Sequence, residues 1–589
     1  MKLHIPEQLG TTKDAFVSQP EQFKAWLADL PQTNMGELTR NVYNALCEHN
    51  KQSMPDDDRL ENLEMLRGPL REIFDNLKKH FINRTLPLPE KSQKIVNLNQ
   101  SLLKEVAIGY KIIISNIANS ETGKLDMIST AICRAIRYQS ELLLRASEVY
   151  AQSPAGTWLD LHTIYDYADK AGITKNSVDD HESETQTATI EDYYKQILLF
   201  ALARPIALRQ RDTELVYNKL SEWAKLTELS NTPDESEVKR IFCIRVEQDR
   251  PPNYLKQEDC EKSYVVKTLD ASALSESIQY NLDNVDTDKD GYTFGDELSP
   301  ETLQVLTSSW GVFAKRRFAR STRIGHISAA IGIISAAKAI KDEDAIRKAS
   351  DPLYDGSIEK TREQLNASLA LLSDSVQSEQ VDASKDSPSK SDFNDTDKIA
   401  LNNNHQMNQG DVDLHWEIVN VSAGGYCLRW NSDETSKAQI GELIALRERE
   451  ANGSFQWRVG AIRWMQYTRE HGLEIGVQLL SPNACPATIK RKDSPDKSTT
   501  NCIILPGINP LKLPATLLLP THSFKIQDNF ECTTLGQVME IKLSAIKEKT
   551  GSYTRFLFIK TDASTTLYNT DRKLSLEDTD DFAEIWSSL

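Results

Sequence analysis

The spacing of apolar residues changes along this chain, and that change limits the folds it can adopt. From Leu98 to Ile113, and again from Ile128 to Leu143, apolar residues recur every three or four positions, as in helices packed in a bundle. After residue 412, apolar and polar residues alternate in short runs, as in half-buried β-strands. Glycine follows the same division, because only seven of the 24 glycines precede residue 291. The sequence therefore predicts a helical first half and a β-rich second half.

These patterns divide the 589 residues into several domains, as expected at roughly 150 residues per domain. Short β runs at 240–246 and 263–266 indicate a small α/β module, whereas the polar stretch at about 375–410 has too few apolar residues to fold. The predicted fold class is multidomain α+β. Its parts are a helical domain at 1–235, a small α/β module at 236–312, a β-barrel at 313–485 with a disordered insert at about 341–411, and a C-terminal β domain at 498–589.

Composition excludes several classes of function. A net charge of −17 has the wrong sign for a protein that coats nucleic acid, so no nucleic-acid partner is predicted. No apolar run reaches the roughly 18 residues of a membrane span, and the first residues carry no apolar signal core, so we expect a cytoplasmic protein without a transmembrane segment. The eight cysteines are never closer than 17 residues apart, which favours buried hydrophobic side chains over zinc sites or disulfides.

Signatures of enzymes are missing from the sequence. It has no phosphate-binding GxxxxGK[ST] loop, no HExxH zinc motif and no GxSxG nucleophile motif, so no catalytic residues are predicted and the chain is interpreted as a non-enzyme. Asp179, Asp180, His181 and Glu182 could in principle bind a metal. Because they lie in a polar stretch, a solvated surface loop is the favoured interpretation.

One segment reproduces the ligand spacing of a calcium loop. Asp286, Asp288, Asp290, Tyr292 and Glu297 occupy ligand positions 1, 3, 5, 7 and 12 of an EF-hand. Position eight is a threonine where an aliphatic residue normally pairs with a second loop, and no second loop is found. An acidic surface connection is therefore the favoured interpretation, with a weak calcium site as the alternative, and no cofactor is required.

The predicted barrel carries a motif of known type. Residues 420–425 read Asn-Val-Ser-Ala-Gly-Gly, which matches [D/N]xSxxG, and 457–464 and 475–480 are similar to closing strands of the same barrel. On these segments the region resembles the PilZ domain family, which implies a six-stranded β-barrel. PilZ domains also carry an RxxxR motif before their first strand, and no arginine lies between Arg362 and Arg429. However, Arg316 and Arg320 form an RxxxR directly before an alternating strand at 326–334, so the barrel is interpreted as split by the insert.

The resemblance implies cyclic di-GMP as the ligand. It would be bound by Arg316 and Arg320, with Asn420, Ser422 and Gly425 forming the opposing wall. Arginine suits such a ligand because its planar fork bonds guanine O6 and N7 and also binds phosphate. The leading hypothesis is a receptor that relays ligand level through the helical half to an unknown protein partner. The alternative is a non-binding PilZ-like scaffold for protein contacts, and the C-terminal β domain is a candidate for a second, motif-less barrel of the same kind.

Overall fold

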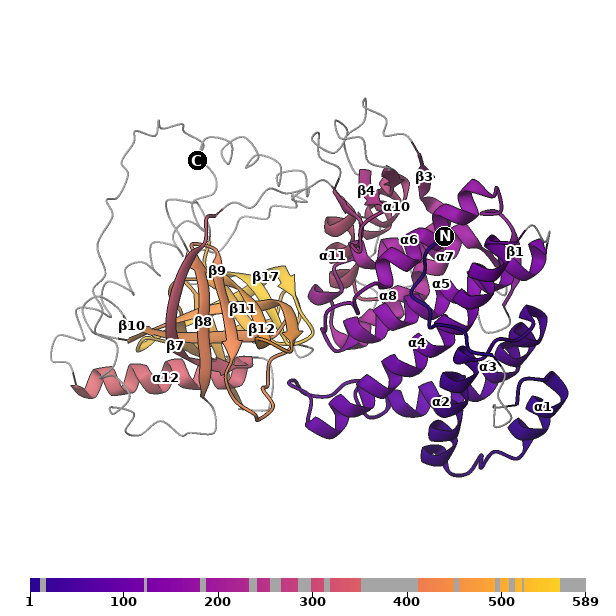
Figure 1. Cartoon of the computed structure of the whole chain (residues 1–589). Helices are drawn as coiled ribbons and strands as arrows, with labels where there is room; N and C mark the ends of the chain where they lie inside the picture. Colours follow the sequence, from indigo (N-terminus) through magenta and orange to yellow (C-terminus); the bar gives the residue numbers. More distant parts are fainter. Residues whose placement is uncertain are drawn as a thin grey trace. The chain divides into compact units, whose positions relative to one another are not determined.

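The structure is a computed structural model, drawn with its helices and strands labelled in Figure 1. The chain divides into two compact units, one containing the helices, a small sheet and a first barrel, the other a second barrel. The residues that the structure describes are 1–10, 17–120, 124–180, 187–231, 241–254, 266–283, 298–311, 318–350, 412–449, 455–492, 498–507, 514–521 and 524–561.

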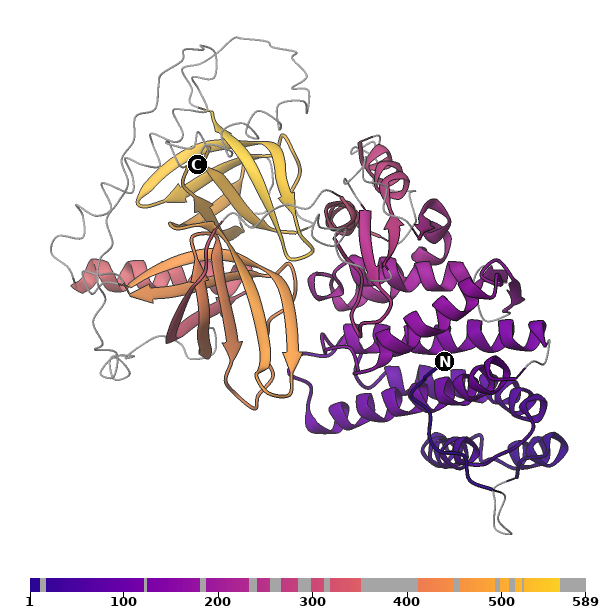
Figure 2. The ribbon, with the colours of Figure 1, turned by 45° about the horizontal axis from the view of Figure 1, so that its top comes forward.

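The first part of the chain is a helical assembly. Its α-helices are α1 (Pro20–Ala28), α2 (Met35–Lys51), α3 (Asp56–Lys78), α4 (Glu90–Ala118), α5 (Leu125–Glu148), α6 (Thr157–Lys170), α7 (Ile190–Leu202) and α8 (Gln210–Trp223). The long helices α4 and α5 pack against each other (Figure 2), and the apolar stripes predicted from the sequence supply the contact. Val106, Ile113, Ile132 and Ile136 are fully buried, which confirms the helical prediction.

A four-stranded sheet follows the helices, with strand order β3-β6-β4-β5. These strands are β3 (Glu228–Ser230), β4 (Ile241–Arg245), β5 (Asn253–Tyr254) and β6 (Val266–Asp270), accompanied by α10 (Ser272–Asp283) and α11 (Pro300–Trp310). Phe242 and Trp310 belong to the same hydrophobic cluster as the helical assembly, and the Trp310 indole donates to the Leu199 carbonyl at 3.2 Å. The α/β module therefore shares a core with the helices that precede it.

The first barrel closes with strand order β10-β11-β12-β9-β8-β7. Its strands are β7 (Ser321–Ile331), β8 (Asp413–Ser422), β9 (Gly425–Trp430), β10 (Leu443–Arg449), β11 (Phe455–Thr468) and β12 (Gly472–Ser481). Strands β7 and β8 pair directly although about 80 residues separate them in the sequence, so the barrel is interrupted after its first strand as predicted. Its interior is filled by large side chains such as Trp416, Leu428 and Ile475.

The chain that follows β7 is helical over part of the range for which the sequence predicted disorder. The chain leaves β7 at Gly332, which has a φ of 92°, and continues as α12 (Ile333–Ser350). The prediction of disorder from residue 341 was therefore wrong for 341–350. Ala336 and Ile340 are buried on one side of this helix. The segment contains many good helix formers, but the charged residues near 341 led to the prediction of disorder. The remainder of the predicted insert lies outside the described residues.

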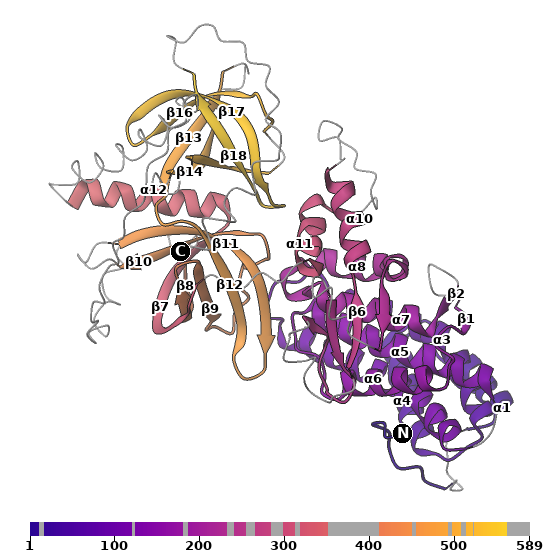
Figure 3. The same ribbon diagram turned by 90° about the horizontal axis from the view of Figure 1, so that it is seen from above.

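A second closed barrel occupies the C-terminal region, with strand order β13-β14-β15-β18-β17-β16 (Figure 3). Its strands are β13 (Cys485–Arg491), β14 (Thr499–Leu505), β15 (Thr516–Pro520), β16 (Asn529–Thr534), β17 (Gln537–Lys549) and β18 (Tyr553–Lys560). This barrel begins at Cys485 rather than at 498. Numbered from their own first strands, the two barrels have the same cyclic order, 1-2-3-6-5-4, so the predicted C-terminal β domain is a second barrel of the same topology.

Candidate ligand-binding site

The motif at 420–425 forms a tight turn between β8 and β9. Ser422 pairs with Gly425 across the turn, and the Ser422 hydroxyl lies 3.4 Å from the Gly425 carbonyl oxygen, which accepts its hydrogen bond. Gly425 has a φ of 151°, and a Cβ added there would lie 1.9 Å from the carbonyl oxygen of Val477. Only glycine lets β9 approach β12 so closely, so the glycine of the motif is a packing requirement of the turn.

Strand pairing brings the start of β7 beside this turn. Asn420 on β8 lies opposite Thr322 on β7, two residues after Arg320. Arg320, Asn420, Ser422 and Gly425 all line one pocket of about 200 Å³. Four of the five ligand-binding residues predicted from the sequence therefore come together, although about 100 residues separate Arg320 from the others. Arg316 lies outside the described residues.

Several further residues that line this pocket were not predicted as ligand-binding, and three of them have large side chains suited to a ligand. They are Phe318, Arg463 and Trp464. A Cβ at Gly476 would lie 1.8 Å from the Trp464 indole nitrogen, so the missing side chain of this glycine is what makes room for the indole. The Arg463 Nε donates to the Gln478 side-chain oxygen at 2.7 Å. The quoted segment 457–464 already contained Arg463 and Trp464, but their place at the pocket follows from β11–β12 pairing.

The charge of Arg320 acts on Cys427, another residue that lines the pocket. Burial raises the pKa of the Cys427 thiol to about 11, and Glu474 also raises it, whereas Arg320 and Arg429 act in the opposite direction. Arg429 is itself paired with Glu474 at 2.7 Å. Arg320 is exposed and lines the pocket, so its guanidinium is available to an oxyanion.

A second pocket of about 440 Å³ adjoins the first. It shares Arg320, Ser422 and Tyr426 with the first pocket and adds Glu448 and Arg458. The turn formed by the motif is therefore lined by polar side chains on both sides, and a ligand that contacts Ser422 can reach both pockets.

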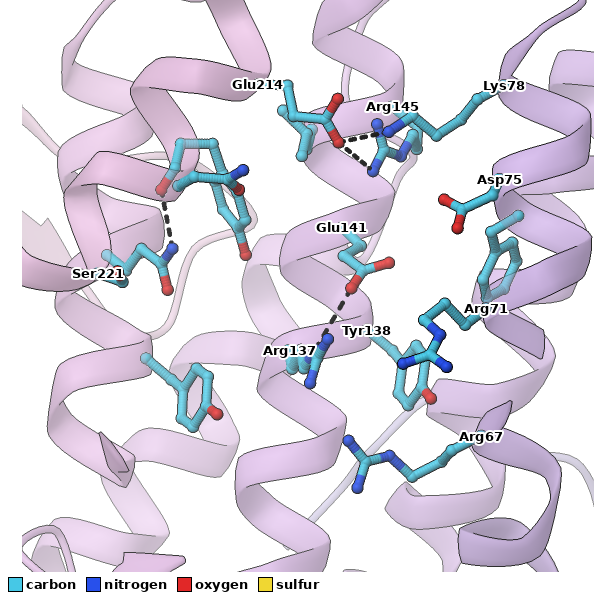
Figure 4. A pocket seen from close by; sticks show the side chains of 16 residues that line it. Arg67, Arg71, Asp75, Lys78, Arg137, Tyr138, Glu141, Arg145, Glu214 and Ser221 are labelled. Atoms are coloured by element: carbon cyan, nitrogen blue, oxygen red, sulfur yellow. Dashed lines mark hydrogen bonds and ion pairs between the residues drawn. The ribbon is translucent and has the colours of Figure 1, made fainter. Parts of the chain in front are cut away.

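A separate pocket of about 240 Å³ lies among α3, α5, α7 and α8 of the helical assembly (Figure 4). Its charged side chains largely neutralise one another: Arg137 pairs with Glu141, and Glu214 pairs with both Lys78 and Arg145. These pairs are satisfied within the protein, which makes this pocket a weaker candidate than the barrel site.

The interpretation of 179–182 as a solvated loop was wrong for Asp180. Its side chain is completely buried, with ion pairs to Arg67 and Arg137 at 2.5 Å each and to Arg134 at 3.2 Å. The Tyr193 hydroxyl donates to the same carboxylate at 2.8 Å. Asp179 is exposed at the end of β1 (Ser177–Asp179), whereas 181 and 182 lie outside the described residues.

Other predicted features have separate outcomes. The calcium loop at 286–297 lies outside the described residues and stays a prediction. Within the described part of the chain, no group of three or more histidine, cysteine, aspartate or glutamate side chains could hold a metal ion. None of the described helices is long and apolar enough to cross a membrane. Seven cysteines are described, all are free, and six of them are buried, as predicted for small hydrophobic side chains.

Comparison with known proteins agrees with the geometry of the first barrel. Residues 241–486 match the family described as the middle PilZ domain of the cyclic-di-GMP receptor FimW. The chain belongs to the family of PilZ-type cyclic-di-GMP receptors.

The similarity extends beyond the PilZ barrel. Residues 21–234 match the N-terminal domain of the cyclic-di-GMP receptor FimW, and 485–561 match the FimW C-terminal beta-barrel domain. The cyclic-di-GMP receptor FimW of Pseudomonas aeruginosa is 25% identical over 613 aligned positions, which cover 100% of this chain and 99% of that protein. No solved structure matches the chain.

Proposed function

We propose that this protein is a cytoplasmic receptor that binds cyclic di-GMP in the first barrel and passes the bound state to a protein partner. The observation that carries the proposal is the pocket in which Arg320 faces Asn420, Ser422 and Gly425. The similarity of the whole chain to a cyclic-di-GMP receptor supports the choice of ligand. We propose that the protein binds this ligand and does not catalyse a reaction, because the matched families are named as receptors.

The chemistry of the pocket suits a cyclic dinucleotide, which presents two phosphates and two guanines. Arg320, and Arg316 from the same motif, would bind phosphate or the O6 and N7 edge of guanine. Asn420 and Ser422 offer neutral hydrogen-bonding groups, and Trp464 offers an aromatic face for a base. The two adjoining pockets, of about 200 and 440 Å³, together fall within the roughly 300–1,000 Å³ of small-molecule sites.

Contacts within the larger compact unit support a relay through the helical half. Leu86, in the connection after α3, accepts a hydrogen bond from the Ser436 amide of the barrel at 2.7 Å. Tyr150, after α5, accepts one from the Tyr467 amide at 2.8 Å. Both side chains belong to the hydrophobic cluster of the barrel. A change in the barrel on ligand binding therefore has buried contacts through which it can act on the ends of helices.

Isothermal titration calorimetry of the full chain with cyclic di-GMP tests the proposal. We expect saturable binding that Arg320→Ala weakens by roughly ten- to a hundredfold, because a hydrogen bond to a charged group contributes about 1.5–3 kcal/mol. Arg469→Ala, which removes another exposed arginine that lies outside both pockets, should bind like the unaltered chain. A folded chain that binds no cyclic dinucleotide would contradict the proposal and favour the PilZ-like scaffold.

A further inference from the structure

A single carboxylate in the second pocket is surrounded by donors. The Glu448 side chain is 11% exposed and lies 2.5 Å from Arg323 Nη1 and 2.6 Å from Arg458 Nε. The Tyr426 hydroxyl donates to the same carboxylate at 2.9 Å. Glu448 therefore engages two guanidinium groups and one hydroxyl beside Arg320 and Ser422.

Strand pairing explains why these groups converge. Glu448 lies near the end of β10, which pairs with β7 on one side and β11 on the other. Arg458 on β11 lies opposite Leu446, two residues from Glu448, so both side chains are on the same face. Arg323 follows Thr322, the partner of the motif asparagine, and Tyr426 follows the motif glycine.

The charges in this cluster affect an anionic ligand in two ways. Glu448 occupies guanidinium donors that would otherwise bind phosphate, and its own negative charge repels phosphate from the pocket. Because Glu448 is nearly buried, water screens this repulsion poorly. Burial raises the pKa of Tyr426 and Glu448 raises it further, whereas Arg458 and Arg323 act in the opposite direction.

We propose that Glu448 sets the affinity and the charge selectivity of the site by competing with ligand phosphates for Arg323 and Arg458. This inference rests on the proposed binding of cyclic di-GMP. The two phosphodiesters of the cyclic ligand carry one negative charge each. The linear dinucleotide 5′-pGpG has a terminal phosphate with a charge of about −1.5 to −2 in addition to its phosphodiester. Glu448 should therefore disfavour the linear molecule more strongly than the cyclic one.

Glu448→Gln tests this inference because it keeps the shape of the side chain and removes its charge. In calorimetry we expect the variant to bind cyclic di-GMP about tenfold more tightly and 5′-pGpG by a larger factor, so that discrimination between the two decreases. When Arg458→Ala is combined with Glu448→Gln, it should weaken cyclic di-GMP binding roughly tenfold, because that arginine is then released from its ion pair. In the unaltered chain the same substitution should weaken binding only about two- to threefold.

A matched control comes from another carboxylate–arginine pair among the described strands of this barrel. Glu474 is bonded to Arg429 at 2.7 Å but lines neither pocket, so Glu474→Gln should leave both affinities unchanged. Equal or weaker binding by a folded Glu448→Gln chain would overturn the inference. If that variant fails to fold, a tenfold or larger loss from Arg458→Ala alone would overturn it, because Arg458 would then already contact the ligand. Absence of binding by the unaltered chain would instead overturn the proposed function itself.

Discussion

Replacing Asp180 by asparagine should destabilise the helical assembly more than most single substitutions. The carboxylate is completely buried and has ion pairs with Arg67, Arg134 and Arg137. Burial alone would raise its pKa, but these arginines outweigh that effect and hold the pKa well below the usual range. Asparagine has nearly the same shape but no charge, so the three guanidinium groups lose a shared counterion. Breaking a buried ion pair in this way costs about 3–5 kcal/mol.

That cost can be measured by thermal unfolding of the full chain at pH 7. A domain of about 150–250 residues shifts its melting temperature by roughly 2–4 °C per kcal/mol, so the first transition should fall by roughly 6–20 °C. The depressed pKa means that this stability is present above the unfolded value near 4 and is lost as the pH falls below it. Asp179→Asn is the control, since its side chain is exposed and should matter little. Melting of Asp180→Asn within 2 °C of the unaltered chain would refute the reasoning.

Two further predictions concern the turn and a buried histidine. Gly425→Ala should destabilise the first barrel and remove cyclic di-GMP binding, because the added Cβ would clash with the Val477 carbonyl oxygen. Thermal melting and calorimetric titration measure both effects. Gly325→Ala is the control, because a Cβ at that position has open space around it. Burial lowers the pKa of His49 to about 3 from 6.5, and the Arg59 charge contributes, so stability should fall as pH drops from 6.5 towards 3. The free energy of unfolding should change by at most about 1.4 kcal/mol per pH unit in this range. Urea unfolding at several pH values should show a weaker pH dependence for His49→Gln.

Periodicity predicted the fold well where one pattern dominated a segment. The stripes of α4 and α5 and the alternating strands of the first barrel are confirmed, because each reflects burial of one side of a regular element. Prediction was poorer where burial depends on distant partners. Strands β13, β14 and β16 were not predicted, and the C-terminal domain was therefore placed to begin at 498 instead of Cys485.

The candidate site shows the same limit at the level of single residues. Ser422 and Gly425 could be predicted because the turn they form is local. Arg463 and Glu448 could not, since they reach the site only through the register of β10, β11 and β12, which a single sequence does not specify. Asp180 was misjudged for a related reason. Its polar neighbours indicated a solvated loop, whereas its three arginine partners come from α3 and α5.

The shared topology of the barrels raises the question of whether the second also binds ligand, and its sequence argues against this. In the first barrel, strands two and three are joined by the two residues between Ser422 and Gly425, whereas Leu505 and Thr516 of the second are joined by ten. No arginine occurs at 475–484, directly before β13, where an RxxxR motif would have to lie. We therefore expect all binding to depend on the first barrel. An Arg320→Ala, Arg463→Ala double variant should lose the entire calorimetric signal, and a residual titration with part of the original stoichiometry would place a second site elsewhere in the chain.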